Sequence, residues 1–386
     1  MPSPCSSRSV ASESPLTRGA NPSALRVLPE LRATHLEQRD HFLPADFFYF
    51  EENYDVRGAD KPDGVRRVTL VSLLRELWGT PATVLELTEP LWVRFLPKWL
   101  VLAFWWKLSG ILRHEPHRLV VYAMENNSVA RLIGGSRRVP GWVERTFAWC
   151  VGLASLLTID RLCFATPGSA ATYRSMPFVD RIPQNELIDL PAPAVRARET
   201  PSSMSVTFLG VLEERKGIPA LLEAWEEVER WVPDATLRVA GPGPLGPMVE
   251  SWCTQRPSSR VSLGHLSHEE SAQLLSTTRV LVSPSVPVGR FREQVCLPVQ
   301  EALAHGVTVV STAETGLAGW LAANGHLVVN ARADHRHFTG QLTVALIQAL
   351  RAPLDPGTIL ASLPEVGGWK RANSWLHADF TLGRTL

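Results

Sequence analysis

The chain has 386 residues, of which 45% are hydrophobic, and its formal net charge is +1. This length favours two domains over one, and the apolar fraction is ample for packed cores. The near-neutral charge gives no indication of a nucleic-acid partner. The five cysteines are scattered without C-x-x-C spacing, so we expect no zinc site and a reducing, cytoplasmic location.

Residues 1–40 open with a stretch rich in serine, proline and arginine and contain no continuous apolar segment. We expect them to form a disordered or loosely packed N-terminal extension rather than a signal peptide. The longest fully apolar run covers residues 99–106, which is eight residues against the roughly 20 that cross a bilayer. We therefore expect no transmembrane span.

Residues 41–190 show strand patterns alternating with helix patterns. Strands are predicted at residues 46–51, 82–87, 119–124 and 161–165, and helices at residues 68–78, 142–157 and 170–174, with a long tryptophan-rich helix after the second strand. This alternation is typical of a parallel sheet covered on both faces.

Residues 191–203 are polar and proline-rich, which indicates a linker. A second α/β series follows over residues 204–365. Its strands are predicted at residues 205–209, 236–240 and 261–263, and its helices at residues 218–232, 246–255 and 267–277. The chain is therefore expected to form two α/β domains.

The stretch at residues 281–312 has the pattern of a strand, a loop, a short helix and a second strand. Pro298 suits the first turn of that helix and Gly306 suits its end. The loop then lies at the carboxyl end of a parallel strand, where open α/β sheets bind ligands. Glu293 in the loop and Glu301 in the helix can face the same crevice. Paired carboxylates suit a ligand rich in hydroxyl groups, such as a sugar and a ribose.

This stretch resembles the E-x7-E signature of retaining, metal-independent glycosyltransferases of the GT-B fold, the family 4-like or group 1 glycosyl transferases. Their common form is S-x-x-E-G-F-G-L-P-x-x-E-A-x-A-x-G, and the residues that match it in step are Glu293, Leu297, Pro298, Glu301, Ala302, Ala304 and Gly306. A surface helix with two solvated glutamates is the alternative, and it would not place so many partners in register. The resemblance implies two Rossmann-like domains facing a central cleft. It also implies a C-terminal helix within residues 366–386 that crosses back to the first domain.

Two further segments resemble the same family. Residues 210–217 follow the first strand of the second domain and match the form G-R-L-x-x-x-K-G, with Gly210 and Lys216 in place. Backbone amides and a lysine at a helix start suit a diphosphate. Residues 241–245 match a G-x-G-P-L turn through Gly241, Gly243 and Pro244, although alone this is an ordinary tight turn.

The resemblance implies a role for each matched residue. Lys216 would stabilise the departing diphosphate, Glu293 would hold the sugar hydroxyls, and Glu301 would hold the ribose diol. We therefore expect Glu293 and Lys216 to be catalytic, and the donor to be a UDP- or GDP-linked sugar used without metal or other cofactor. The further residues expected to line the donor site are Gly210, Gly241, Gly243, Pro244, Arg290, Gln294, Val295, Cys296 and Leu297.

Three departures from the family form keep a second interpretation open. Val211 occupies the arginine position, and Gln294 and Cys296 occupy glycine positions, where side chains could crowd the sugar. The alternative is a catalytically degenerate protein of this fold that binds a sugar nucleotide and serves as a partner or scaffold. Arg215 or Arg290 could instead replace the missing arginine. A dinucleotide-dependent enzyme is disfavoured because no G-x-G-x-x-G follows a first strand.

Cys296 could also be considered as a nucleophile. No histidine lies near it in the sequence to activate it, so we expect a buried, apolar cysteine.

The first domain is expected to present the acceptor, which would be the hydroxyl of a glycan, a lipid-linked sugar or a natural product receiving a hexosyl or related group. Residues directly after its strands are the candidates, because carboxyl ends of parallel strands face the cleft. They are Glu89, Glu125, Asn126 and Asn127. His114 and His117 precede a strand and are expected at the surface.

The tryptophan-rich helix admits two interpretations. Its aromatic and basic residues suit an interfacial helix, which would place the protein peripherally at the inner membrane face. Its nearly all-round apolarity favours burial in the core, since a helix between two strands of a parallel sheet must bury one face.

Overall fold

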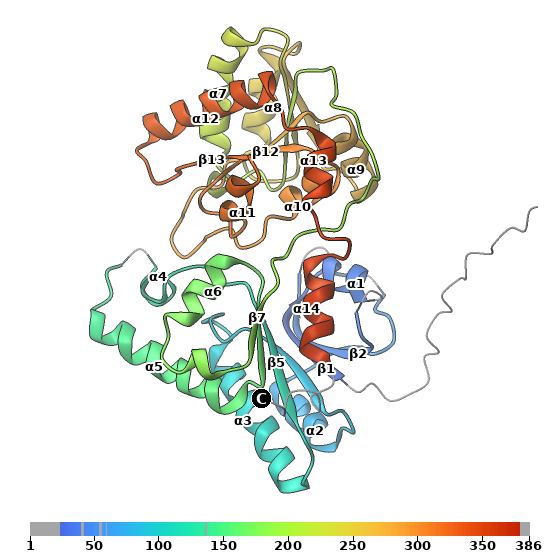
Figure 1. Ribbon diagram of the computed structural model, residues 1–386, viewed down its shortest axis with the longest axis vertical. Coiled ribbons are helices and arrows are strands. Elements are labelled where there is room, and N and C mark those ends of the chain that lie inside the picture. The colour runs from blue at the N-terminus through green and yellow to red at the C-terminus, as the bar shows by residue number, and fades with distance from the viewer. Residues whose placement is uncertain (1–23, 40–41, 54–55, 59, 136, 379–386) are drawn as a thin grey trace, which may run out of the picture.

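The computed structural model describes residues 24–39, 42–53, 56–58, 60–135 and 137–378. Within them the chain forms two α/β domains, each built on a parallel sheet (Figure 1). The strand order is β3-β2-β1-β4-β5-β6-β7 in the first sheet and β10-β9-β8-β11-β12-β13 in the second. In both sheets the order reverses beside the strand that comes first in the chain, where open α/β sheets bind ligands. The predicted pair of Rossmann-like domains is confirmed.

The first domain carries seven strands. They are β1 (Ala24–Leu31), β2 (Ala45–Glu52), β3 (Val65–Arg67), β4 (Val84–Thr88), β5 (Arg118–Ala123), β6 (Arg161–Phe164) and β7 (Gln184–Glu186). Its helices are α1 (Ala33–Gln38), α2 (Leu70–Gly79), α3 (Leu96–Arg113), α4 (Val129–Gly134), α5 (Gly141–Thr158) and α6 (Pro167–Arg174), followed by the 3-10 turn η2 (Val179–Arg181). The short strands β3 and β7 close the two edges of the sheet and were not predicted.

Alternating side chains of these strands pack on opposite faces of the sheet. In β5, Leu119 and Val121 belong to the core under α2, α3 and α5, whereas Val120 and Tyr122 pack on the opposite face. This period of two is the expected consequence of strand geometry in a sheet covered on both faces.

The first residues of the described chain overturn an expectation. Residues 24–38, predicted to be part of a loose extension, form β1 and α1, and β1 lies between β2 and β4 inside the first sheet. The sequence hides this strand because Arg26 and Pro29 interrupt its apolar pattern. Arg26 is buried only because Glu86 of β4 pairs with it at 2.7 Å, and Pro29 lies beyond Val27, where the pairing with β4 ends. Residues 1–23 of the predicted extension lie outside the described residues.

The second domain follows the predicted series closely. Its strands are β8 (Ser205–Leu209), β9 (Thr236–Ala240), β10 (Arg260–Gly264), β11 (Val280–Ser283), β12 (Thr308–Thr312) and β13 (Leu327–Val329). Its helices are α7 (Ile218–Trp231), α8 (Gly246–Thr254), α9 (His268–Ser276), α10 (Leu297–Ala304), α11 (Ala318–Ala323), α12 (His335–Arg351) and α13 (Pro356–Ala361), with the 3-10 turn η3 (Glu214–Lys216). Helices α7, α8 and α12 share a core on one face of the sheet, and α10 and α13 share one on the other. Residues 187–204, all of them described, form no helix or strand between the two sheets.

The last helix, α14 (Gly368–His377), crosses back to the first domain, as the resemblance implied (Figure 1). Ala372 and Leu376 pack beside Val120 and Tyr122 of β5. His377 Nε2 lies 2.8 Å from Glu86 Oε2, which places the end of the helix over the Arg26–Glu86 pair. The two sheets are therefore linked twice, by residues 187–204 and by the returning chain.

His117 is a second correction. It was expected at the surface, yet it is buried and its ring stacks on Trp106 with centroids 3.7 Å apart. The chain turns back at His114, which is exposed and has a φ of 57° at the end of α3. Gly110 leaves room for the returning ring, since a Cβ there would lie 2.7 Å from His117 Cβ. A tight turn after a helix thus buries a residue that the sequence pattern places outside.

The tryptophan-rich helix α3 has one buried and one exposed apolar face. Trp99 and Trp106 are fully buried, whereas Phe104 and Ile111 are 44% and 70% exposed. The predicted core packing is confirmed for the first face. None of the described helices combines the length and apolarity that crossing a bilayer would need.

Candidate active site

Three of the predicted donor-site glycines form a close-packed platform at the carboxyl ends of β8 and β9. The Gly210 amide donates to the Ala240 carbonyl at 3.0 Å, and the Leu212 amide to the Pro242 carbonyl at 2.7 Å. A Cβ at Gly241 would collide with the Gly210 carbonyl, and one at Gly243 would collide with Leu212. Both glycines have a strongly positive φ, which side chains disfavour. Pro244 follows them and is exposed.

The two predicted catalytic residues meet beside the strand-order reversal of the second sheet. Lys216 comes from the loop after β8 and Glu293 from the loop after β11. Lys216 Nζ forms an ion pair with Glu293 Oε2, and Ser285 Oγ donates to the same oxygen at 3.0 Å. Gly217 fixes this approach, because a Cβ there would collide with the Pro284 carbonyl. Glu293 is buried, so the pair forms in a partly desolvated place.

Glu301 lies in α10 and keeps its carboxylate available. Its nearest charged partner is His268 Nδ1 at 3.8 Å, and among the described residues no group donates a hydrogen bond to its side chain. Burial raises the pKa of Glu301, His268 opposes this shift, and the carboxylate of Glu37 in α1 adds to it.

Among the described residues, six hydrogen bonds join the loop that carries Glu293 to the first domain. Side chains of the first domain donate to its backbone: Arg131 to Gly289 at 2.9 Å, Asn127 to Arg290 at 3.1 Å and Asn126 to Glu293 at 3.0 Å. Loop side chains donate in return: Arg290 to the Ile133 carbonyl at 2.7 Å, Arg292 to the Asn126 carbonyl and Gln294 to Glu125 Oε2 at 3.2 Å. The position of Glu293 therefore depends on both domains.

The predicted acceptor-side residues lie at this junction. Asn126 and Asn127 are buried, and the Oδ1 atom of each finds no hydrogen-bond donor among the described residues. Buried polar atoms are normally satisfied, so these two oxygens are suited to accept from a ligand hydroxyl. Glu125 accepts from the backbone amide of Asn127 at 2.9 Å as well as from Gln294.

Glu89 has a different role from its neighbours. Its carboxyl accepts from the amides of Met124 and Glu125 at 3.0 Å and from the Tyr173 hydroxyl at 2.9 Å. Burial raises the pKa of Glu89 to about 8, and the nearby Glu125 carboxylate adds to the shift. Glu89 is therefore a buried support for the ends of β4 and β5.

The profile of the Glycosyl transferases group 1 family matches residues 203–347. The second domain is therefore similar to this family. The match spans β8 to α12 and contains the glycine platform, Lys216, Glu293 and Glu301. A search of curated proteins finds no match to the chain.

Solved structures extend the likeness to both domains. HepE from Anabaena in complex with UDP is 11% identical, with a TM-score of 0.56 over 88% of this chain and 97% of its own. WaaG, a glycosyltransferase involved in lipopolysaccharide biosynthesis, is 12% identical, with a TM-score of 0.55 over 92% of this chain and 100% of its own. Sucrose-phosphate synthase from Thermosynechococcus elongatus is 15% identical, with a TM-score of 0.54 over 92% and 94%. These likenesses show that the chain has the GT-B fold.

The departures of the glycosyl transferases group 1 domain from its common form have structural explanations. The Gln294 side chain points to Glu125 of the first domain. Cys296 is buried at the start of α10, where burial raises the pKa of its thiol to about 11, as expected for a buried, apolar cysteine. Val295 is partly buried in the core beside α10, and Leu297 is exposed.

Neither candidate for the missing arginine lies free beside Lys216. Arg215 pairs with Glu213 and lies over the Phe291 ring, 4.3 Å from its centroid. Arg290 is directed to the Ile133 carbonyl of the first domain. The proposed substitution for Val211 therefore stays a prediction that would require either arginine to move.

Several residues of the site escaped the sequence analysis. Ser285 supplies a hydroxyl to Glu293, whereas the family form has its serine at the position of Arg290. Arg292 and Arg332 both pair with the buried Glu314, which holds the loop after β12 against the site. The serine in the family form could have suggested that a hydroxyl group lies near Glu293. The contacts of Arg292, Arg332 and Glu314 gave no such signal, because they join distant parts of the chain. Among the described residues, no group of three or more His, Cys, Asp or Glu side chains could hold a metal ion.

Proposed function

We propose that this protein is a retaining glycosyltransferase that moves a sugar from a nucleotide-sugar donor to an acceptor hydroxyl without a metal ion. The observation that carries the proposal is the Lys216–Glu293 pair, set between a glycine platform and the unpartnered amide oxygens of Asn126 and Asn127. The pair unites a cation suited to a diphosphate with a carboxylate suited to sugar hydroxyls.

Charge development explains how such a pair would act. As the bond to the sugar breaks, negative charge grows on the diphosphate and positive charge grows on the sugar. Lys216, released from Glu293 by the donor, would stabilise the leaving phosphate. Glu293 would accept hydrogen bonds from the sugar and offset its positive charge. Glu301, whose carboxylate accepts no hydrogen bond from a described residue, would bind the ribose diol.

The acceptor would enter from the first domain. Its hydroxyl would lie near Asn126 and Asn127 and attack from the face that the diphosphate leaves, which retains the configuration. No second carboxylate on the opposite side of the bond is needed, unlike in hydrolases. A UDP-linked donor is favoured because HepE, which has this fold, was solved with UDP.

We also propose that the first domain contacts the inner membrane surface. Exposed large apolar side chains gather on α2, α3 and α5, three helices at the same end of the molecule (Figure 1). They are Val71, Trp78, Val101, Phe104, Leu108, Ile111, Leu112, Trp142, Trp149 and Leu157. Arg75 and Arg145 are exposed on the same helices and complement anionic lipid headgroups.

Vesicle sedimentation tests this contact. Phe104→Ser with Ile111→Ser should weaken binding to vesicles of phosphatidylglycerol and phosphatidylethanolamine, because the apolar area entering the interface shrinks. Val344→Ser, an equally exposed apolar position on α12 of the other domain, is the control. Equal vesicle binding by both variants and the wild type would refute the contact.

The function itself is tested by thermal unfolding with UDP-, GDP-, ADP- and TDP-sugars. A ligand that binds the folded state raises its melting temperature. One donor class should stabilise the wild type, and Glu301→Ala should lose most of that shift because it removes the proposed ribose contact. Glu269→Ala, an exposed glutamate of α9, should retain the shift.

Donor hydrolysis in the absence of acceptor completes the test. Stabilisation with measurable hydrolysis supports an active transferase. Stabilisation without any turnover, across all donors and candidate acceptors, would favour the degenerate binding protein. Full donor affinity in Glu301→Ala would refute the assignment of the site.

A further inference from the structure

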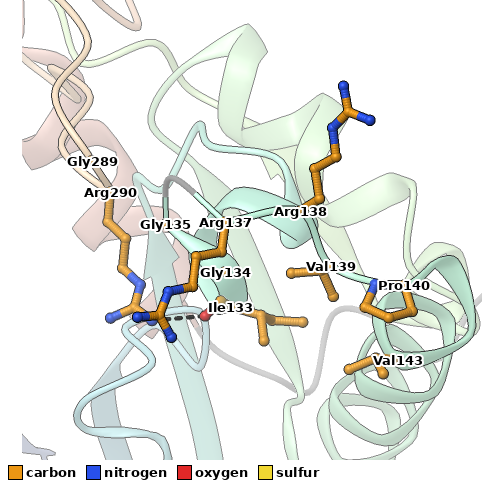
Figure 2. A pocket seen from close by; sticks show the side chains of 10 residues that line it. All are labelled: Ile133, Gly134, Gly135, Arg137, Arg138, Val139, Pro140, Val143, Gly289 and Arg290. Atoms are coloured by element: carbon orange, nitrogen blue, oxygen red, sulfur yellow. Dashed lines mark hydrogen bonds between the residues drawn. The ribbon is translucent and has the colours of Figure 1, made fainter.

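A cavity of about 590 Å³ opens between the first domain and the Glu293 loop (Figure 2). Residues 133–135, residues 137–140 and Val143 of the first domain line most of it, and Gly289 and Arg290 of the second domain complete it. Arg290 Nη2 donates to the Ile133 carbonyl at 2.7 Å and so joins the two sides. The cavity therefore exists only where the two domains meet.

The cavity is strongly basic. Arg137, Arg138 and Arg290 line it, and no carboxylate of the described chain forms an ion pair with any of them. Arg292, two residues along the same loop, is in contrast paired with Glu314. In Figure 2 the side chains of Arg137 and Arg290 extend toward the same end of the cavity, while Arg138 points away. Two guanidinium groups without a counter-charge favour an anion between them.

The remaining wall of the cavity is apolar. Ile133, Val139, Pro140 and Val143 lie opposite or beside the arginines (Figure 2). Val143 belongs to the first turn of α5, and the neighbouring Trp142 is 67% exposed. The apolar wall thus continues onto the exposed apolar face of α5. An anion with an apolar extension fits this combination better than a small polar ion does.

The cavity also lies close to the proposed reaction centre along the chain. Arg290 precedes Glu293 by three residues, and Asn127 holds the Arg290 carbonyl at 3.1 Å. A molecule held here would touch the same loop that positions Glu293. Contact with this loop fits an acceptor better than a separate regulator.

We propose that this cavity binds the acceptor and that the acceptor carries a phosphate group joined to an apolar chain. Arg137 and Arg290 bind the phosphate, and Val139 and Val143 contact the apolar chain. The inference rests on the proposed glycosyl transfer and names its acceptor class. A phosphate suits the two guanidinium groups because several of its oxygens can accept hydrogen bonds at once.

Calorimetric titration of the full chain in the presence of UDP tests this proposal. The probes are octyl phosphate, octyl glucoside and glucose 1-phosphate. Octyl glucoside carries the apolar chain without a phosphate, and glucose 1-phosphate carries a phosphate without the apolar chain. Comparing them with octyl phosphate shows which group the cavity binds and distinguishes a lipid phosphate from a soluble sugar phosphate. Octyl phosphate should bind the wild type most tightly, because it alone offers both groups.

Variants assign the binding to the cavity. Arg137→Gln should weaken octyl phosphate binding about tenfold, since it removes a charge-assisted hydrogen bond. Val143→Thr should weaken octyl phosphate and leave glucose 1-phosphate unchanged. Arg336→Gln, an exposed arginine of α12 distant in sequence from the cavity, should change neither. Equal melting temperatures of Arg137→Gln and the wild type confirm that folding is intact.

Each outcome separates this inference from the proposed function. UDP binding with unchanged octyl phosphate affinity in Arg137→Gln would refute the cavity and leave the transferase intact. Glucose 1-phosphate binding as tightly as octyl phosphate would refute the apolar half of the acceptor. Absence of binding by UDP, GDP, ADP and TDP alike in the wild type would instead refute the proposed function.

Discussion

The two domains share the order of their first six strands and differ in what stands at the strand ends. In the second domain the loops after β8 and β11 bring Lys216 and Glu293 together, two opposite charges. In the first domain the loops after β4 and β5 bring Glu89 and Glu125 together, two carboxyl groups. The ion pair lies between the first and fourth strands of its domain, and the acidic pair lies between the fourth and fifth strands of the other.

The difference shows how strand ends at the same edge of a sheet can acquire different roles. Opposite charges leave both groups ready to exchange partners with a charged ligand. A buried carboxyl beside a second carboxylate retains its proton, as the raised pKa of Glu89 indicates, and backbone amides fix it in place. The second domain holds the charged pair that we propose to be reactive, and side chains of the first domain donate hydrogen bonds to the Glu293 loop.

The largest expected effect is on the reaction rate, and it follows from replacing Lys216 of the charged pair. Lys216→Met keeps the length of the side chain and removes the cation that would stabilise the diphosphate. Sugar transfer or donor hydrolysis should fall by about 10²- to 10³-fold, the usual consequence of losing one such donor. Lys370→Met, on the exposed side of α14, is the control and should keep the wild-type rate. A rate of Lys216→Met equal to that of the wild type would refute the proposal that the second domain holds the reactive charges.

A smaller effect, on stability, is expected in the first domain. Between the ordinary glutamate pKa and about 8, folded Glu89 keeps a proton that the unfolded chain has released. The free energy of unfolding should therefore decrease as the pH rises from 7 to 8, by at most about 1.4 kcal/mol per pH unit. Glu89→Gln should remove this slope. Urea denaturation at several pH values measures it.

The same variant tests the role of Glu89. Its carboxyl is enclosed by Tyr173 and two backbone amides, so Glu89→Gln should reduce turnover far less than Lys216→Met does. The histidines and thiols with shifted pKa values titrate outside the window from pH 7 to 8. A slope that persists in Glu89→Gln would show that another group carries the pH dependence.

The sequence predicted the second domain better than the first for a physical reason. The strands and helices of the second domain have regular apolar patterns, and Lys216, Glu293 and Glu301 occupy short motifs. The strand β1 is hidden because the burial of Arg26 depends on Glu86, sixty residues away. Local patterns do not encode such pairing.

The sequence predicted which residues lie between the two domains but not the hydrogen bonds that they form. The strand-end rule placed Asn126 and Asn127 at the correct edge of the sheet. It could not show that their side chains hold the Glu293 loop, because these hydrogen bonds join residues more than 150 positions apart. The cavity lined by Arg137 and Arg290 was missed for the same reason.

The smallest expected effect is on stability and acceptor use, and it concerns the contact of Gln294 with the first domain. Gln294 replaces a family glycine, and its amide donates to Glu125 across the cleft at 3.2 Å. If the side chain connects the domains, Gln294→Gly should lower the free energy of unfolding by about 1 kcal/mol and weaken acceptor use. If it crowds the donor, the same change should raise turnover.

The sign of the effect therefore decides between a connection and an obstruction. We expect a decrease, because the geometry directs the Gln294 amide to Glu125 and the Glu293 loop has five further hydrogen bonds to the same domain. Gln294→Ala separates the loss of the amide from the added backbone freedom of glycine. Gln348→Ala on the exposed face of α12 controls for a general effect. A rise in turnover with both Gln294 variants would show that the first domain restrains the donor site rather than supporting it.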